Sequence, residues 1–477
     1  MYNSRSVLLR MCLLAPCLPY SHAAAVELPW LSGNSNSAMP QGLSTQRLAD
    51  ELGATSTQAG AEVNSQPRAG ALGLRDAVAI AVNRHPSILS AASAISQQEG
   101  AVDQARAGYY PRISAGVNSG RVSTYGHGQI ATVSVSQMLH DFGKVSGSVN
   151  QAQGQVFKQQ ALLLKQIDTI AEETAQTLLE VHRQQALLKI ASDQVRAMQS
   201  VLEMVKLRAD SGLTSQSDFI QATTREQSAR SNHQQVSTLL DQWRARLATL
   251  VGDNQPNTIA TPPSDLEHAA HLDSPWDYTR LPDVLAAEAD RKSANGQLEN
   301  AKAQRYPTIA LEGSANKALS GTNPNNGIDQ GSYNTAMITG SMMLYQGGAV
   351  SAQIRSATAG IERADALIRE ARLAAENQLR SSRKQAVGAR IRMGILGQRM
   401  ASMTETRELY REQYRVGTRS VLDLLNAEQE VYQAAAELET TRHDYWAGLV
   451  TYIGATGRSR EAYSLNDTSI QQIEIQP

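Results

Sequence analysis

Two stretches of the sequence carry the same polar residues at the same spacing. "SGLTSQSDFIQATTRE" begins at Ser211 and "VGTRSVLDLLNAEQEV" begins at Val416. In each, a serine follows a glycine by three residues and an aspartate follows it by six, which pairs Gly212, Ser215 and Asp218 with Gly417, Ser420 and Asp423. A glycine there suits a turn that reverses a helix, and a carboxylate early in the returning helix meets the positive end of the helix dipole. The residues alone therefore favour helix-start electrostatics for both aspartates.

Other candidates for chemistry are few. His127 and His140 lie near a loop and a strand end, without an acid or cysteine at the spacing of a metal site, and His182, His233 and His443 are isolated on helical faces. We find no Ser/His/Asp order, phosphate-binding glycine loop or dinucleotide signature. We therefore expect solvated or packed histidines, no enzyme activity, no cofactor and no metal site.

Composition and the N-terminal segment limit the possible partners. The 477 residues carry 44 Lys and Arg against 45 Asp and Glu, which gives no electrostatic reason to expect nucleic acid. Residues 1–25 are predicted to be a signal peptide, with an uncleaved anchor or a lipid-modified Cys17 as alternatives. Residues 26–73 are predicted to be flexible. No later run of apolar residues is long enough for a helical membrane span.

The offset of 205 residues extends far beyond the two glycine turns. It holds without a gap when Leu139 to Gly252 is compared with Leu344 to Gly457, which indicates an internal duplication. We predict a first repeat over 74–252, a linker over 253–280, a second repeat over 281–457 and a C-terminal tail over 458–477.

Each repeat is predicted to contain two strands followed by two long helices. The predicted elements are strands 113–119 and 129–139 with helices 143–211 and 218–249, then strands 308–315 and 334–344 with helices 348–416 and 423–455. The strands alternate apolar and small polar residues over a length typical of membrane-crossing strands, although a soluble hairpin is the alternative. Four such strands leave open edges, so a membrane barrel requires several copies.

The first long helix carries a regular apolar stripe. Its positions recur every seven residues, which predicts packing in coiled-coil fashion: Ile167, Thr174, Val181, Leu188, Val195 and Leu202. The second long helix keeps the stripe at Leu379, Ala386, Met393 and Met400, but not at Arg372 and Arg407. The fold class is therefore mainly α with membrane β.

From Leu74 to Gly457 the chain resembles the TolC family of outer-membrane efflux proteins. The motif with most weight is "YRVGTRSVLDLLNAEQEVYQAAAELETTRHDYWAGLVTYIGATG", supported by Tyr110-Pro111, Tyr306-Pro307 and "LYQGGAVSAQIRSA". The resemblance implies a homotrimer with a β-barrel in the outer membrane and an α-helical barrel in the periplasm. It also implies outer-membrane lipid around the barrel, and docking onto a periplasmic adaptor protein and an inner-membrane transporter.

The resemblance further implies roles at the helix tips. Gly212 and Gly417 match the turns that close the tunnel and dock the adaptor. Gate-tethering roles fall on Tyr414 and Arg419, with Asp218 and Ser217 as their respective partners. Asp423 matches an entrance-lining acid, whereas Asn426 stands where the family has a second acid, so a weaker acidic ring is expected.

Two classes of exported substrate remain open. The phrase "LHDFGKVS" and the cysteine-free helices resemble members that serve type I protein secretion, including adhesin export, and this favours an ABC-type transporter. A drug or metal efflux channel is the first alternative, and a soluble periplasmic coiled-coil scaffold is the second.

Overall fold

The computed structural model describes residues 71–122, 126–253, 259–260, 266–273, 275, 277–466, 469–470 and 473–474. These residues all fall in one compact unit, Ser65–Pro477. The predicted signal peptide and nearly all of the predicted flexible segment lie outside the described residues.

Two helices precede the first strand. α2 (Leu74–Arg84) ends at His85, which caps α3 (Pro86–Arg106) by accepting a hydrogen bond at Nδ1 from the backbone N–H of Ser87. Pro86 occupies the first turn of α3, where its missing N–H removes no helical hydrogen bond. The short turn η1 (Ala107–Tyr109) then leads into the sheet.

One antiparallel sheet contains strands from both repeats. Its order is β1 (Arg112–Val122), β2 (Gly126–His140), β3 (Thr308–Ser320) and β4 (Ser332–Ser341), so that β2 and β3 join the repeats while β1 and β4 are edges. The strands mostly extend past the predicted bounds. β4 instead ends at Ser341, before the predicted 344, because its last ladder partner is Thr308 at the start of β3.

The two faces of this sheet differ in polarity. On one face, Ser114, Ser134, Ser314 and Thr335 are in register across the four strands. Their hydroxyls bond in pairs, at 2.7 Å between Ser114 and Ser134 and 2.8 Å between Ser314 and Thr335. The other face exposes large apolar side chains: Ile113, Val117, Val133, Val135, Leu311 and Ile338.

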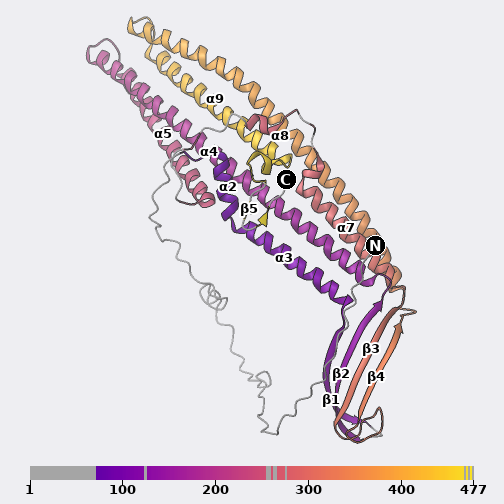
Figure 1. Cartoon of the computed structure of the whole chain (residues 1–477). Helices are drawn as coiled ribbons and strands as arrows, with labels where there is room; N and C mark the ends of the chain where they lie inside the picture. The colour runs from indigo at the N-terminus through magenta and orange to yellow at the C-terminus, as the bar shows by residue number, and fades with distance from the viewer. Residues whose placement is uncertain are drawn as a thin grey trace, which may run out of the picture. The chain divides into compact units, whose positions relative to one another are not determined.

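Two helical hairpins form most of the remaining structure. The first consists of α4 (Lys144–Asp210) and α5 (Gln216–Val251), and the second of α8 (Ala349–Arg415) and α9 (Val421–Ala455). At 1.5 Å per residue, α4 and α8 are each about 100 Å long. Figure 1 shows the sheet at one end of these helices and the two hairpin tips at the other. The mainly helical fold with a small sheet is thus confirmed.

The return helices begin slightly earlier than predicted. α5 starts at Gln216 and α9 at Val421, two residues before the predicted 218 and 423. The reason is that Ser215 and Ser420 act as N-caps, so that each aspartate becomes the third helical residue.

Shorter elements complete the described part of the chain. α7 (Pro282–Ala303) packs against both α4 and α8. The predicted linker holds α6 (Leu266–Ala270) and η2 (Tyr278–Arg280). The predicted tail holds α10 (Ser459–Ala462) and the strand pair β5 (Ser469–Ile470) and β6 (Ile473–Glu474).

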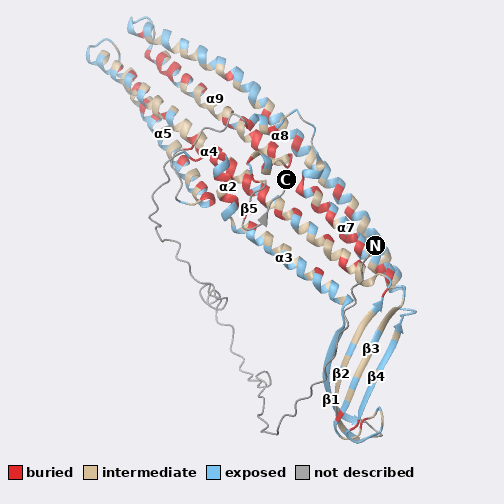
Figure 2. Ribbon diagram, in the orientation of Figure 1, coloured by how far each residue is buried: buried red, intermediate tan, exposed pale blue. Residues whose placement is uncertain are grey.

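The main core lies around the middle of α4 and is built from both repeats. α2, α4, α9 and the chain after α10 meet there, and Figure 2 shows buried residues on all three of these helices. The predicted stripe is buried at Ile167, Thr174 and Val181, and the second stripe at Leu379 and Ala386. A smaller apolar cluster joins the hairpins near their tips.

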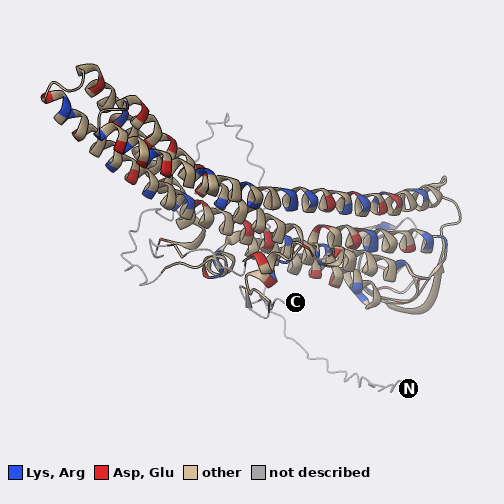
Figure 3. Ribbon diagram, turned by 90° about the horizontal axis from the view of Figure 1, so that it is seen from above, with Lys and Arg blue, Asp and Glu red and all other residues tan. Residues whose placement is uncertain are grey.

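Charge is distributed along the helices rather than on the sheet. Lys, Arg, Asp and Glu are spread along the long helices in Figure 3, and few of them lie in the strands. Among the described residues, no helix is both long enough and apolar enough to cross a membrane.

Candidate gate at the hairpin tips

Each hairpin tip is a glycine turn. Gly212 has φ +71° and Gly417 has φ +86°, the left-handed conformation that glycine adopts without a Cβ penalty. In the residue after each glycine, the backbone N–H closes the turn: Leu213 donates to Arg208 O at 2.8 Å, and Thr418 to Gln413 O at 2.9 Å. Both repeats therefore reverse the chain in the same way.

Asp218 is engaged by its own helix start. Its backbone N–H donates to Ser215 Oγ at 3.1 Å, while its Oδ2 accepts from the Ser215 N–H at 3.3 Å and from Thr214 Oγ1 at 2.6 Å. These hydrogen bonds hold the pKa of Asp218 below its usual value, and the bond from the Thr214 hydroxyl has the largest effect. This capping box is the role that the residues alone favoured.

Asp423 repeats only part of this arrangement. Its N–H donates to Ser420 Oγ at 3.1 Å, and the Ser420 hydroxyl lies 2.9 Å from its Oδ2. Arg419 Nη1 is 3.9 Å from the same oxygen. Because Asp423 remains substantially exposed, its carboxylate is available to solvent at the tip.

Tyr414 is buried between the two hairpins. Its hydroxyl has no hydrogen-bond partner among the described residues. Burial raises the pKa of Tyr414, and the nearby Asp218 carboxylate adds to that rise. The predicted Tyr414–Asp218 hydrogen bond is therefore not formed within this chain, because the Asp218 carboxylate is turned to Thr214 and Ser215.

Arg419 also has partners within its own hairpin. Its guanidinium lies 4.0 Å from the centre of the Tyr410 ring, in addition to the ion pair with Asp423. Among the described residues, Arg419 Nε has no hydrogen-bond partner and no bond joins Arg419 to Ser217, so the second predicted link is not formed within one chain either.

Two arginines that the sequence analysis did not select connect the hairpins. Arg208 of α4 donates from Nη1 to Tyr414 O at 2.6 Å, and its guanidinium lies 4.8 Å from the Tyr414 ring centre. Arg225 of α5 donates from Nη2 to Asn426 Oδ1 at 3.2 Å and from Nη1 to Gln429 Oε1. Asn426 is therefore an acceptor in a contact between the hairpins.

A comparison of the two repeats could have singled out these arginines, because the second repeat does not contain them. The residues 205 positions later are Gln413 and Glu430, so neither arginine is duplicated. An arginine that occurs in only one of the two matching tips is a candidate for a contact with the other tip. Its partner there depends on how the hairpins pack.

The second hairpin also contains a buried ion cluster. Glu428 on α9 is fully buried and pairs with Arg411 on α8, and Arg407 Nη1 lies 3.9 Å from its Oε2. The matching position in the first hairpin is Thr223. Such a carboxylate depends on its arginines, since removing one partner leaves an uncompensated buried charge.

In the part of the chain that the structure describes, no group of three or more His, Cys, Asp or Glu side chains is arranged to hold a metal ion.

Comparison with known proteins identifies the family. The model of the family described as outer membrane efflux protein matches residues 78–253 and 279–458, which covers most of both repeats. Outer membrane efflux protein BepC of Brucella suis biovar 1 (strain 1330) is 25% identical over 403 residues, covering 81% of this chain and 85% of that protein. Alkaline protease secretion protein AprF of Pseudomonas aeruginosa is 25% identical over 428 residues, covering 80% and 85%.

The fold is similar to solved channels as well. The outer membrane protein VceC of Vibrio cholerae superposes with a TM-score of 0.70 at 18% identity, covering 80% of this chain and 96% of that one. Family members are passive outer-membrane channels rather than enzymes, and they form homotrimers that work with adaptors and inner-membrane transporters. The chain belongs to the outer membrane efflux protein family and is an outer-membrane protein with a large periplasmic helical part.

Proposed function

We propose that three copies of this chain form the exit channel of a tripartite export system that serves type I protein secretion. The observation that supports a channel is the open sheet, whose two faces differ in polarity. The ladder pairs no further strand with β1 or with β4 among the described residues, and an unpaired edge in hydrocarbon costs several kcal/mol for each backbone group. Closing three such sheets into one barrel removes every edge.

The two faces indicate how that barrel is oriented. The face with Val133 and Val135 would contact lipid, and the hydroxyl ladder through Ser134 would line the lumen. Glu312 is paired in register with Ser136, on the same face as Ser134, as expected for a lumen residue. Nitroxides at Val133 and Val135 should report lipid and one at Ser134 should report water, whereas the reverse pattern would contradict this orientation.

The gate lies at the opposite end, where Arg208 and Arg225 already join the hairpins. We propose that the Tyr414–Asp218 and Arg419–Ser217 links add to these contacts in the closed assembly, where the Tyr414 hydroxyl gains a partner. At about 0.5–1.5 kcal/mol for each hydrogen bond, two links in each of three chains contribute roughly 3–9 kcal/mol. That range holds a two-state opening mostly shut, yet adaptor binding can overcome it.

Single-channel conductance in planar bilayers tests the gate. Tyr414→Phe combined with Arg419→Ser should raise conductance, because both links are removed. Asp423→Ala should leave conductance nearly unchanged and weaken cation preference, because it removes the exposed entrance carboxylate. Unchanged conductance in the double variant would show that these side chains do not hold the gate.

Two features favour protein secretion as the transport task. The phrase "LHDFGKVS" at the end of β2 resembles channels of type I secretion, and one relative is named for alkaline protease secretion. This favours an ABC-type transporter as the inner-membrane partner. BepC is named an efflux protein, which keeps small-molecule efflux as the second candidate. Deleting the gene should remove specific proteins from the culture medium. Unchanged secretion with increased drug sensitivity would favour efflux instead.

A further inference from the structure

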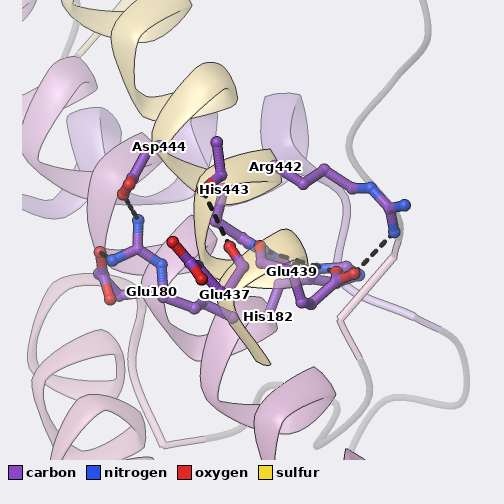
Figure 4. Close-up of polar contacts among 9 residues, drawn as sticks. Glu180, His182, Glu437, Glu439, Arg442, His443 and Asp444 are labelled. Carbon is purple, nitrogen blue, oxygen red and sulfur yellow. Dashed lines mark hydrogen bonds and ion pairs between the residues drawn. The ribbon is translucent and has the colours of Figure 1, made fainter. Parts of the chain in front are cut away.

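Two histidines that the sequence predicted to be isolated meet between the repeats. His182 of α4 and His443 of α9 lie 261 residues apart in sequence, yet His182 Nδ1 is 2.8 Å from His443 Nε2. Their ring centres are 5.0 Å apart, and the Trp446 ring packs edge-on against both. Figure 4 shows the two histidines among the polar residues of α4 and α9. The matching positions in the other repeat are Val387 and Thr238, so the pair occurs once in the chain.

The hydrogen bonds determine where the protons lie. His443 Nδ1 is 2.8 Å from the backbone oxygen of Glu439, and a carbonyl oxygen only accepts, so Nδ1 carries a proton. In a neutral ring, Nε2 is then the acceptor, and His182 Nδ1–H donates to it. The pair is therefore a directed chain of two hydrogen bonds when both rings are neutral.

Protons on both rings disrupt this chain. The first added proton can bind His182 Nε2, which leaves the hydrogen bond from His182 Nδ1–H to His443 Nε2 in place. A second proton leaves two N–H groups facing each other across the same 2.8 Å. Since His443 is fully buried, the proton that it takes up adds a positive charge to a site removed from solvent.

The surrounding charges do not favour a protonated histidine. On α4, Arg183 pairs with Glu180 at 3.1 Å and with Asp444 of α9 at 2.7 Å. On α9, Arg442 pairs with Glu439 at 2.7 Å, while Glu439 Oε1 is 3.6 Å from His443 Nδ1. From α8, Arg392 donates to Glu437 of α9 at 2.8 Å. Arg399 of α8 also pairs with Glu437, at 2.9 Å, so four arginines balance these four carboxylates and a histidinium adds an unbalanced positive charge.

Burial and these arginines act on both rings in the same direction. Burial lowers the pKa of His443 to about 4, with His182, Arg183 and Arg442 adding to the effect. Burial also lowers the pKa of His182, with the Glu439 carboxylate opposing the shift and Arg442 adding to it. Burial raises the pKa of Glu180, so acid removes that negative charge and increases the positive excess.

We propose that the His182–His443 pair is an acid-sensitive latch, whose neutral form holds the second hairpin on the first and whose protonation releases it. The proposal rests on the channel function, because release is expected to open the tunnel entrance. α9 runs 20 residues from Asp423 to His443, about 30 Å along the helix, so the latch acts well above the tip contacts. Adaptor docking acts at the tips, whereas the latch responds to the pH of the periplasm.

The sign follows from the lowered pKa of His443. The latched state disfavours the proton, so its stability is complete above about pH 6.5 and falls as the pH drops towards 4. Between about pH 7 and about pH 4.5, the ratio of released to latched chains should rise roughly 50-fold for one titrating ring.

The test uses the full-length trimer and two readouts. Nitroxides at exposed Lys189 of α4 and Gln433 of α9 measure the helix separation by double electron–electron resonance, and planar bilayers measure conductance. From about pH 7 to about pH 4.5, the wild type should gain a longer distance population and higher conductance. His443→Gln should lose both responses, since an amide does not titrate in this range. His182→Gln should lose them as well, because its amide oxygen can accept a hydrogen bond from a protonated His443 Nε2. His443→Lys should show the long distance and the higher conductance already at neutral pH.

His233→Gln is the matched control. His233 Nε2 bonds Ser192 Oγ at 3.1 Å between α5 and α4, so this variant removes an interhelical histidine outside the pair and should keep the acid response. An unchanged wild-type distance at acid pH would overturn the latch, and so would a response equal to that of the wild type in both His→Gln variants of the pair. If no variant conducts but the distance still lengthens only with both histidines present, the latch stands and the channel function fails.

Discussion

The long helices α4 and α8 occupy equivalent places in the two repeats, but their surroundings differ. Both have 67 residues, and both follow a left-handed glycine, Gly143 or Gly348. α4 packs against α2, α3, α5, α7 and α9, whereas among the described elements α8 packs chiefly against α7 and α9. In Figure 2, α8 is accordingly exposed over most of its length.

At one pair of equivalent positions, the charged residue is buried and the apolar residue is exposed. Asp168 of α4 is 9% exposed, while its counterpart Leu373 of α8 is 68% exposed. Ile391 and Ile395 are also exposed on α8. The polarity of a residue therefore does not reveal which helix is central. An exposed helix of this kind requires cover from another copy, as the homotrimers of this family provide.

The largest expected effect concerns the contact of α8 with a second copy of the chain. Replacing Ile391 and Ile395 together by aspartate should prevent trimer formation, since each unpaired charge buried in an interface costs several kcal/mol. Native gels and size-exclusion chromatography of detergent-solubilised protein measure assembly. Ile391→Val with Ile395→Val keeps the apolar character and should assemble normally. A stable trimer of the aspartate variant would show that this face of α8 does not contact a second copy.

The second prediction compares the pH dependence of stability at buried Asp168 with that at its exposed counterpart, Leu373. Burial raises the pKa of Asp168 to about 7, opposed by Arg460 and reinforced by Glu172. The folded chain therefore favours the protonated carboxyl. Its contribution to the free energy of unfolding is complete below about pH 4 and is lost as the pH rises through 7, which lowers that free energy by about 4 kcal/mol.

Melting curves from acid to neutral pH test this titration. Relative to the wild type, Asp168→Asn should lose that pH dependence, and Leu373→Asn at the equivalent position should keep it. Parallel pH profiles for the wild type and Asp168→Asn would contradict a buried, titrating carboxyl on α4.

The smallest expected effect compares glycines of the two helices. A methyl group on Gly154 of α4 would lie 2.5 Å from the Ser293 nitrogen of α7, whereas one on Gly388 of α8 would meet nothing within 4 Å. Gly154→Ala should therefore lower stability by about 1–3 kcal/mol through overpacking. Gly388→Ala should raise it by about 0.5–1 kcal/mol through helix propensity. The thermal dissociation temperature of the trimer measures both, and equal shifts would remove the contrast between the helices.

Much of this architecture could be predicted from local pattern. The 205-residue offset, the glycine turns and the uninterrupted helices depend on spacing and backbone conformation, which a sequence contains directly. The errors in element ends arose where a cap or a ladder partner decided the boundary. Ser215 starts α5 earlier, and the pairing of Ser341 with Thr308 ends β4.

The sequence by itself therefore determined the duplicated fold, the reversal at Gly212 and Gly417, and the capping role open to Asp218, because these depend on neighbours along the chain. Only the tertiary structure decided that Arg208 reaches the Tyr414 carbonyl and that His182 meets His443. Those partners lie more than 200 residues apart. Their contact depends on how α4 packs against the second hairpin, and periodicity within a single helix carries no information about which face of another helix lies opposite.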